Sequence, residues 1–66
     1  MITQIGIVAG EVWHHLDEHG KVKLSQLLKN IDKPGDTVLM SVGWLAREGH
    51  VILEGKDPDY DISLRK

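Results

Sequence analysis

The strongest structural signal in this chain lies at residues 36–51, which read DTVLMSVGWLAREGHV. Apolar residues recur there with the spacing of one face of an α-helix, at Val38, Val42 and Leu45. Asp36 is suited to cap this helix at its N-terminus, and Gly49 is suited to end it. We therefore expect a helix over about 37–48, followed directly by a strand that begins at Val51.

The residues after this helix predict a β-hairpin. Residues 51–53 are a Val-Ile-Leu run, which is typical of a strand, and residues 55–59 contain the Gly, Asp and Pro of a loop. Apolar and polar residues then alternate, with the apolar positions at Tyr60, Ile62 and Leu64. This alternation predicts a returning strand that pairs with the first one.

The N-terminal part of the chain predicts a long amphipathic helix. Its apolar residues follow the period of a helix, at Ile5, Val8, Ala9, Val12, Trp13 and Leu16. Thr3 is expected to cap this helix and Gly20 to end it. Gly6 and Gly10 lie four residues apart on one face, and each costs about 1 kcal/mol relative to alanine in a helix interior. Two interpretations stay open: the glycines allow another backbone to approach closely, or they are merely tolerated.

The segment between these two helices predicts a short strand and a further helix. Residues 22–24 form a short extended piece, and Ser25 is expected to cap a helix over 26–31. A turn follows, because Pro34 disfavours helix at the residue before it. We therefore expect residues 1–66 to form a single α+β domain of the winged helix-turn-helix type, with three helices, a short strand and a C-terminal β-hairpin wing.

Size and composition narrow the classes of protein to which the chain can belong. A chain of 66 residues has a small core, and small domains gain stability from disulfides, metals or partner chains. There is no cysteine, which excludes disulfides and thiolate zinc sites. No segment approaches the roughly 20 apolar residues of a membrane span, and no leader sequence is evident. We expect a cytoplasmic protein without membrane contact.

Two parts of the sequence resemble known winged-helix proteins. The pattern of Val38, Val42, Leu45, Gly49 and Val51 is similar to the recognition-helix signature of many bacterial winged-helix regulators. Residues 10–13 (GEVW) and 43–49 (GWLAREG) resemble a family of small, stand-alone bacterial and archaeal winged helix-turn-helix proteins of unknown function. This resemblance covers nearly the whole chain, and it implies the winged-helix fold and a homodimer. The DNA binding that it suggests comes from fold analogy, and fold does not determine function.

Our first functional hypothesis is a homodimeric DNA-binding protein of the transcription-regulator type. The formal net charge is −2, but the middle of the chain is basic, with four lysines and one acid between residues 21 and 33. In many winged helices the second helix lies against the phosphate backbone, so these lysines would position the protein on DNA without reading its sequence. The predicted DNA contacts are Lys21, Lys23, Lys29 and Lys33, together with Thr37, Ser41 and Arg47 on the outward face of the third helix.

The alternative hypothesis is a protein-interaction or dimerisation module without DNA binding. The outward face of the third helix is expected to carry Leu39, Met40 and Trp44, where a DNA-reading helix would carry Arg, Asn or Gln. An exposed apolar patch of this kind usually marks a protein contact. The wing would repel phosphate as well, because it carries Glu54, Asp57, Asp59 and Asp61. Two other interpretations stay open: Trp44 completes the core, or the patch is a stacking platform for bases.

The sequence predicts no catalytic centre, no cofactor and no metal site. His15 and His19 have the i, i+4 spacing of helical metal ligands, yet the sequence indicates no third ligand. The loop at 57–61 lacks the central Gly and the terminal Glu of a calcium-binding EF-hand. The sequence also lacks a glycine-rich phosphate loop and a nucleophile elbow. We therefore expect a binding protein whose partner is a second copy, double-stranded DNA or another protein.

Overall fold

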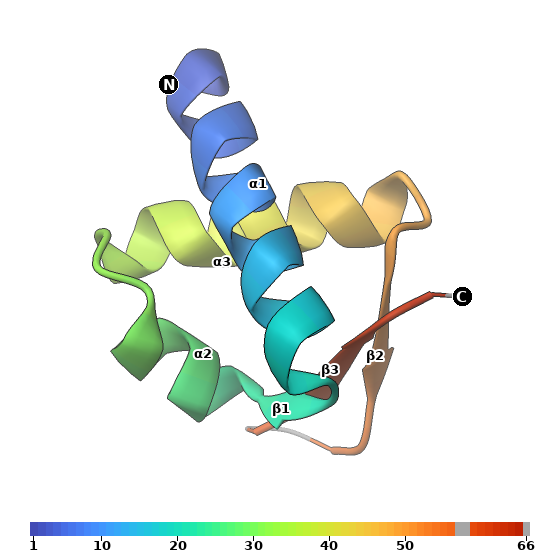
Figure 1. The fold of residues 1–66 in the computed structure, drawn as a ribbon. Coiled ribbons are helices and arrows are strands. Elements are labelled where there is room, and N and C mark those ends of the chain that lie inside the picture. The colour runs from blue at the N-terminus through green and yellow to red at the C-terminus, as the bar shows by residue number, and fades with distance from the viewer. Residues whose placement is uncertain (57–58, 66) are drawn as a thin grey trace.

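The computed structural model describes residues 1–56 and 59–65, and it has the predicted α+β architecture. The elements, in chain order, are α1 (Ile2–His19), β1 (Val22–Lys23), α2 (Leu24–Asn30), α3 (Gly35–Arg47), β2 (Val51–Glu54) and β3 (Asp61–Leu64) (Figure 1). This order of three helices, a short strand between the first two, and a C-terminal hairpin is that of a winged helix-turn-helix.

The predicted N-terminal caps of all three helices are wrong by two residues. α1 begins at Ile2 with Met1 at its N-cap, so Thr3 lies inside the helix. The N-caps of α2 and α3 are Lys23 and Pro34, and both residues have extended backbone angles. Ser25 and Asp36 therefore lie in the first turns of their helices, where their side chains make other hydrogen bonds.

The predicted glycines at the ends of the first and third helices are confirmed, while α2 ends at Asn30, one residue earlier than expected. α1 ends before Gly20, whose φ is 73°, and the turn after α3 contains Gly49 with a φ of 78°. A side chain is strained at such angles, and glycine is the residue that adopts them without cost. These two glycines therefore allow the sharp changes of direction after α1 and α3.

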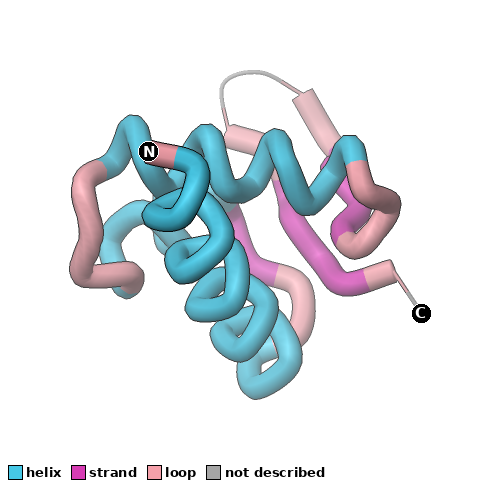
Figure 2. The backbone as a smooth tube through the Cα atoms, turned by 90° about the horizontal axis from the view of Figure 1, so that it is seen from above, coloured by secondary structure: helices cyan, strands magenta, loops and turns pink. Residues whose placement is uncertain are grey.

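A small antiparallel sheet closes the fold on one side. Its strand order is β1-β3-β2, so β3 pairs with both of the other strands. Val22 pairs with Ile62 on one side of β3, and Leu53 pairs with Ile62 on the other. Figure 2 shows that the loop from α2 enters α3 at one end and that the loop into β2 leaves it at the other. The sheet therefore joins the C-terminal hairpin to the segment that connects α1 with α2.

The hydrophobic core draws on every helix and on the central strand. Its most deeply buried apolar side chains are Val12 and Leu16 from α1, Leu27 from α2, Val38 from α3 and Ile62 from β3. Burial of such side chains provides about 25 cal/mol per Å² of apolar surface removed from water. This shared core fixes the direction of α1 relative to α3, and the candidate surface depends on that crossing.

Candidate interaction surface

The buried stripe of α3 is wider than its apolar residues alone predict. Val38, Val42 and Leu45 are buried as expected. Thr37 and Ser41 are buried too, with exposed fractions of 7% and 0%, although the sequence analysis expects them on the outward face. That expectation is wrong because α1 lies against α3 at both positions. The Ser41 hydroxyl lies 3.1 Å from the Ile5 carbonyl of α1, and Thr37 lines a hollow together with Ile7 and Val8 of α1.

Ser41 lies where α3 crosses α1, and its hydroxyl links the two helices. This hydroxyl donates to the backbone carbonyl of Thr37 at 2.8 Å, and the carbonyl of Ile5 in α1 lies 3.1 Å from the same oxygen. A buried hydroxyl of this kind needs such partners, because an unpaired one is costly in the interior. The group is therefore engaged within the fold and points away from any ligand on the outward face.

The outward face of α3 is apolar, as the sequence predicts. Leu39, Met40 and Trp44 are 47%, 39% and 48% exposed. The alternative in which Trp44 completes the core is therefore wrong. Arg47 is exposed near the C-terminal end of the helix. Asp36 is exposed in its first turn, and its carboxylate accepts a 2.8 Å hydrogen bond from the backbone amide of Thr37.

Helix α1 extends this apolar face. Two adjoining hollows share Gly6 and Trp44 in their linings. Ile2 and Ile5 line one hollow, while Gly10 and Trp13 are among the residues that line the other. Met40, which is exposed, lies four residues before Trp44 on the same side of α3. We call the surface formed by Ile2, Gly6, Gly10, Trp13, Met40 and Trp44 the α1/α3 face. Each of these residues can be read from the sequence, but whether they form one surface depends on the angle at which α1 and α3 cross.

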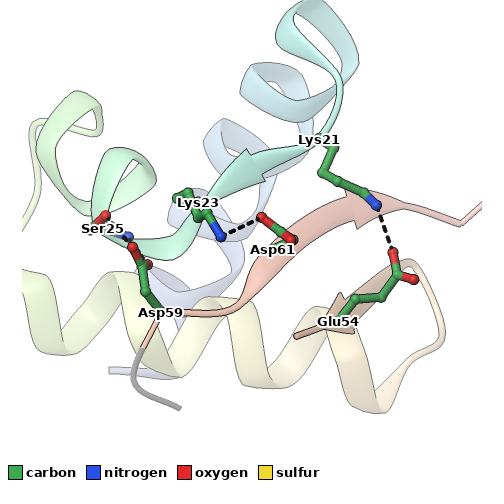
Figure 3. A network of polar contacts seen from close by, with 6 residues as sticks. All are labelled: Lys21, Lys23, Ser25, Glu54, Asp59 and Asp61. Atoms are coloured by element: carbon green, nitrogen blue, oxygen red, sulfur yellow. Dashed lines mark hydrogen bonds and ion pairs between the residues drawn. The ribbon is translucent and has the colours of Figure 1, made fainter. Parts of the chain in front are cut away.

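Three of the four candidate DNA-contacting lysines lie against carboxylates. Lys21 forms an ion pair of 3.0 Å with Glu54, and Lys23 forms one of 3.2 Å with Asp61 (Figure 3). Lys33 forms an ion pair of 3.2 Å with Glu11 of α1. Lys29 is exposed on α2, and within residues 1–56 and 59–65 it has no ion pair. Most of the positive charge expected at this surface therefore has a negative neighbour.

The acidic residues of the wing hold the hairpin against the start of α2. Asp59 accepts hydrogen bonds from the backbone amide of Ser25 at 3.0 Å and from its hydroxyl at 2.9 Å (Figure 3). These two bonds, the amide first, and the nearby Lys23 lower the pKa of the Asp59 carboxyl below its usual value. In the ion pair of Lys21, the hydrogen bond to the Glu54 carboxylate raises the pKa of the lysine. Sequence reasoning misses this role, because 34 residues separate Asp59 from Ser25.

Two weaker ligand hypotheses also have a place in the structure. The rings of His15 and His19 lie 4.3 Å apart on the C-terminal half of α1. The partial burial of His15 lowers its pKa, and the neighbouring His19 lowers it further. The carboxylate of Glu18 raises the same pKa. The described residues contain no group of three or more His, Cys, Asp or Glu that could hold a metal ion. Of the loop at 57–61, which the sequence already argues against as a calcium site, residues 57 and 58 lie outside the described residues.

Comparison with known proteins places this geometry in a family. A family model described as winged helix-turn-helix domain (DUF2582) matches residues 1–64. The chain belongs to this family. The match spans all six helices and strands of the structure, so the DUF2582 domain and the described fold coincide.

Relatives of this DUF2582 chain come from both archaea and bacteria. It is 38% identical over 68 aligned positions to an uncharacterized protein of Methanocaldococcus jannaschii, MJ1608, and the match covers 98% of this chain and 96% of the relative. The solution NMR structure of protein BT2368 from Bacteroides thetaiotaomicron superposes with a TM-score of 0.80 at 32% identity. That superposition covers 94% of this chain and 76% of the other.

Family membership supports the winged helix-turn-helix fold and makes DNA contact a candidate function. The winged helix-turn-helix is typically a DNA-binding rather than an enzymatic fold, so DNA contact is one candidate function for a DUF2582 chain. None of the described helices is both long and apolar enough to cross a membrane. The residues that bind a partner have to be inferred from the surface itself.

Proposed function

We propose that this DUF2582 chain acts as a homodimeric protein-interaction module through the exposed apolar residues of α3. The observation that carries the proposal is the exposure of Leu39, Met40 and Trp44 on the helix that winged-helix DNA binders place in the major groove. Large apolar and aromatic residues are enriched at the centres of protein interfaces. Base edges are read by hydrogen-bonding side chains, which this face lacks apart from Arg47 and the acidic Asp36.

The electrostatics of the surface also favour a protein partner. Lys21, Lys23 and Lys33 each lie close to a carboxylate. Exposed ion pairs of this kind contribute little stability, so the lysine side chains are free to move. Their acidic partners remain beside them, however, and lower the positive potential that would attract a phosphate backbone. The net charge of −2 acts in the same direction.

Sedimentation equilibrium over a range of protein concentrations tests this proposal. We expect a mass of twice the 7.4 kDa of one chain at high concentration, which falls as the protein is diluted. The double variant Met40→Ser, Trp44→Ala should shift the protein towards monomer, because it removes apolar surface from the contact. Ile52→Ser, Leu53→Ser is the matched control, since these β2 side chains are exposed to a similar degree, 39% and 44%. A wild-type protein that stays monomeric at every concentration would contradict the proposal.

DNA contact is the second candidate, and both the fold family and Lys29 favour it. Lys29 is exposed on α2, the helix that approaches the phosphate backbone in many winged helices, and no ion pair among the described residues involves it. Such contact would be electrostatic and independent of sequence, through Lys21, Lys23, Lys29, Lys33 and Arg47. The buried Thr37 and Ser41 do not take part in this version of the proposal.

An amide chemical-shift titration with a random-sequence DNA duplex, at low and then moderate salt, tests the DNA candidate. DNA contact predicts shifts at residues 21–33 and near Arg47 that fade as the salt concentration rises. Lys23→Glu, Lys29→Glu should abolish these shifts and leave the sedimentation behaviour unchanged. An unchanged spectrum at low salt, where the attraction to phosphate is strongest, would reject DNA contact.

A further inference from the structure

Gly6 and Gly10 have no role that the isolated chain explains. Both lie inside α1, where a glycine costs about 1 kcal/mol relative to alanine. A Cβ atom added at either position would meet no atom within 4 Å, so no neighbour in the described structure requires a glycine there. Neither residue has the positive φ that favours glycine. The sequence leaves open whether these glycines allow another backbone to approach or are merely tolerated in the helix. Because no backbone in the described part of the same chain approaches them, any close approach has to come from a second molecule.

The two glycines form a recess beside a projecting ring. They line the hollows that also contain Trp13 and Trp44, and Trp44 is 48% exposed at their edge. Ile2 projects further, with an exposed fraction of 86%. An interface with two-fold symmetry uses the same patch on both copies, so it needs a projection and a matching recess on one surface. The α1/α3 face contains both.

The charge of this face fits a second copy better than a foreign partner. Residues 2–10 carry no charged side chain, and neither do residues 37–46. Two chains of net charge −2 repel each other, so a contact between copies needs a surface without charge. A foreign partner selected by opposite charge would find no charged group here to pair with.

The exposed apolar area is also of the right size. Ile2, Trp13, Met40 and Trp44 are 86%, 38%, 39% and 48% exposed. At about 200 Å² for a large side chain, these fractions expose roughly 400 Å². Each partner in a stable interface contributes about 800 Å², so the four side chains supply roughly half, and the glycine backbone and surrounding residues can supply the rest. The whole chain exposes 4492 Å², so an interface of about 800 Å² per partner would cover nearly a fifth of its surface.

We propose that the α1/α3 face is the homodimer interface, in which Trp44 of each copy packs against the Gly6–Gly10 recess of α1 in the other. This inference rests on the proposed function, and it names both the partner and the surface. It also accounts for the glycines, because an alanine or larger residue at position 6 or 10 would hold the two copies apart.

Substitution of the glycines gives effects of opposite sign on the monomer and on the dimer. Gly10→Leu fills open space in a monomer and improves helix propensity, so the diluted protein should melt at the same or a higher temperature. In the dimer the added side chain crowds the partner, and we expect the dissociation constant to rise about tenfold or more. Gly6→Ala, a smaller change, should act in the same direction. Gly35→Leu is the matched control, because it also adds a side chain in open space but lies at the start of α3, outside both hollows.

Three results of sedimentation equilibrium separate the possibilities. A wild-type dimer that Gly10→Leu dissociates and Gly35→Leu preserves supports the inference. A dimer that survives Gly10→Leu but dissociates in Met40→Ser, Trp44→Ala overturns this interface and leaves the proposed function standing. A monomeric wild type overturns both. Isotope-filtered NMR on a mixture of labelled and unlabelled chains gives a direct readout, since the inference requires intermolecular contacts between the Trp44 indole and the Gly10 Hα protons.

Discussion

Ser41 is the residue at which pattern and packing disagree most. The helical period places it beside the exposed face, yet it is fully buried at the crossing of α1 and α3. The site is suited to a small side chain, because two backbones approach each other there. The hydroxyl satisfies its hydrogen-bonding capacity with backbone carbonyls, so its role lies in the stability of the crossing.

Ser41→Ala should therefore lower the free energy of unfolding without affecting binding. We expect a loss of about 1 kcal/mol, the usual contribution of one buried hydrogen bond. Ser41→Leu should cost more, because overpacking in a tight core costs about 1–3 kcal/mol. Urea unfolding measures both values. If Ser41→Ala kept full stability but lost the amide shifts caused by DNA, the hydroxyl would be a DNA contact after all.

His15 gives the protein a pH dependence that can be assigned to one side chain. Its pKa lies below the ordinary value of 6.5, because it is partly buried and close to His19. The unfolded chain therefore takes up the proton more readily than the folded one, and stability falls as the pH drops from about 7.5 through 6.5 and below. The effect is small, since the ring is only partly buried. Thermal melts from pH 7.5 to 5 should show a shallower decline for His15→Gln, and an unchanged decline would show that another group titrates.

At the scale of elements, the hairpin and α2 are held together by side chains far apart in the sequence. The Asp59 carboxylate takes the place of a local cap, because it accepts a hydrogen bond from the exposed backbone amide of Ser25 in the first turn of α2. A carboxylate near a helix N-terminus also interacts favourably with the helix dipole. The backbone bond from the Leu24 amide to the Tyr60 carbonyl, 2.9 Å long, lies beside this contact.

Asp59→Ala should lower the melting temperature by several degrees. Ser25→Ala should have a smaller effect, because the backbone amide of residue 25 stays bonded to the carboxylate. The pKa of Asp59 is lowered, so its contribution is present above the ordinary value of 3.8 and disappears as the pH falls through the folded-state value. Melts from pH 6 to 2.5 should therefore converge for the wild type and Asp59→Asn at the acid end. Additive effects in the Ser25→Ala, Asp59→Ala double variant would show that the two side chains do not interact.

At the scale of the whole molecule, the chain has a small core and an unusually apolar exterior. Nine large apolar residues are exposed on the described structure, and four of them belong to the α1/α3 face. A domain of this size gains stability when a partner covers such a surface. Association and stability should therefore be linked.

The melting temperature should rise with protein concentration, because dimer formation stabilises the folded state by mass action. Both tryptophans, Trp13 and Trp44, belong to the α1/α3 face, so the emission should shift to shorter wavelength as the dimer forms and excludes water. A concentration series from below to well above the dissociation constant measures the two effects together. A melting temperature and an emission maximum that stay constant over the series would show that the rings remain in water.

The number, order and approximate length of the elements, and the apolar face of α3, can all be predicted from the sequence. These features depend on residues close together in the chain: the helical period of Val38, Val42 and Leu45, the backbone freedom of Gly20 and Gly49, and the alternation before Leu64. Local sequence patterns report such features directly, because neighbouring residues determine helix periodicity and turn geometry.

Which polar side chains are free to bind a partner, and which apolar side chains contact each other, depends on how the elements pack. Lys33 pairs with Glu11 across 22 residues, Ser25 with Asp59 across 34, and Ser41 with Ile5 across 36. The α1/α3 face likewise joins residues of two helices that are distant in sequence. None of these contacts leaves a periodic signal in the sequence, because each depends on the angle and distance at which whole elements pack around the shared core.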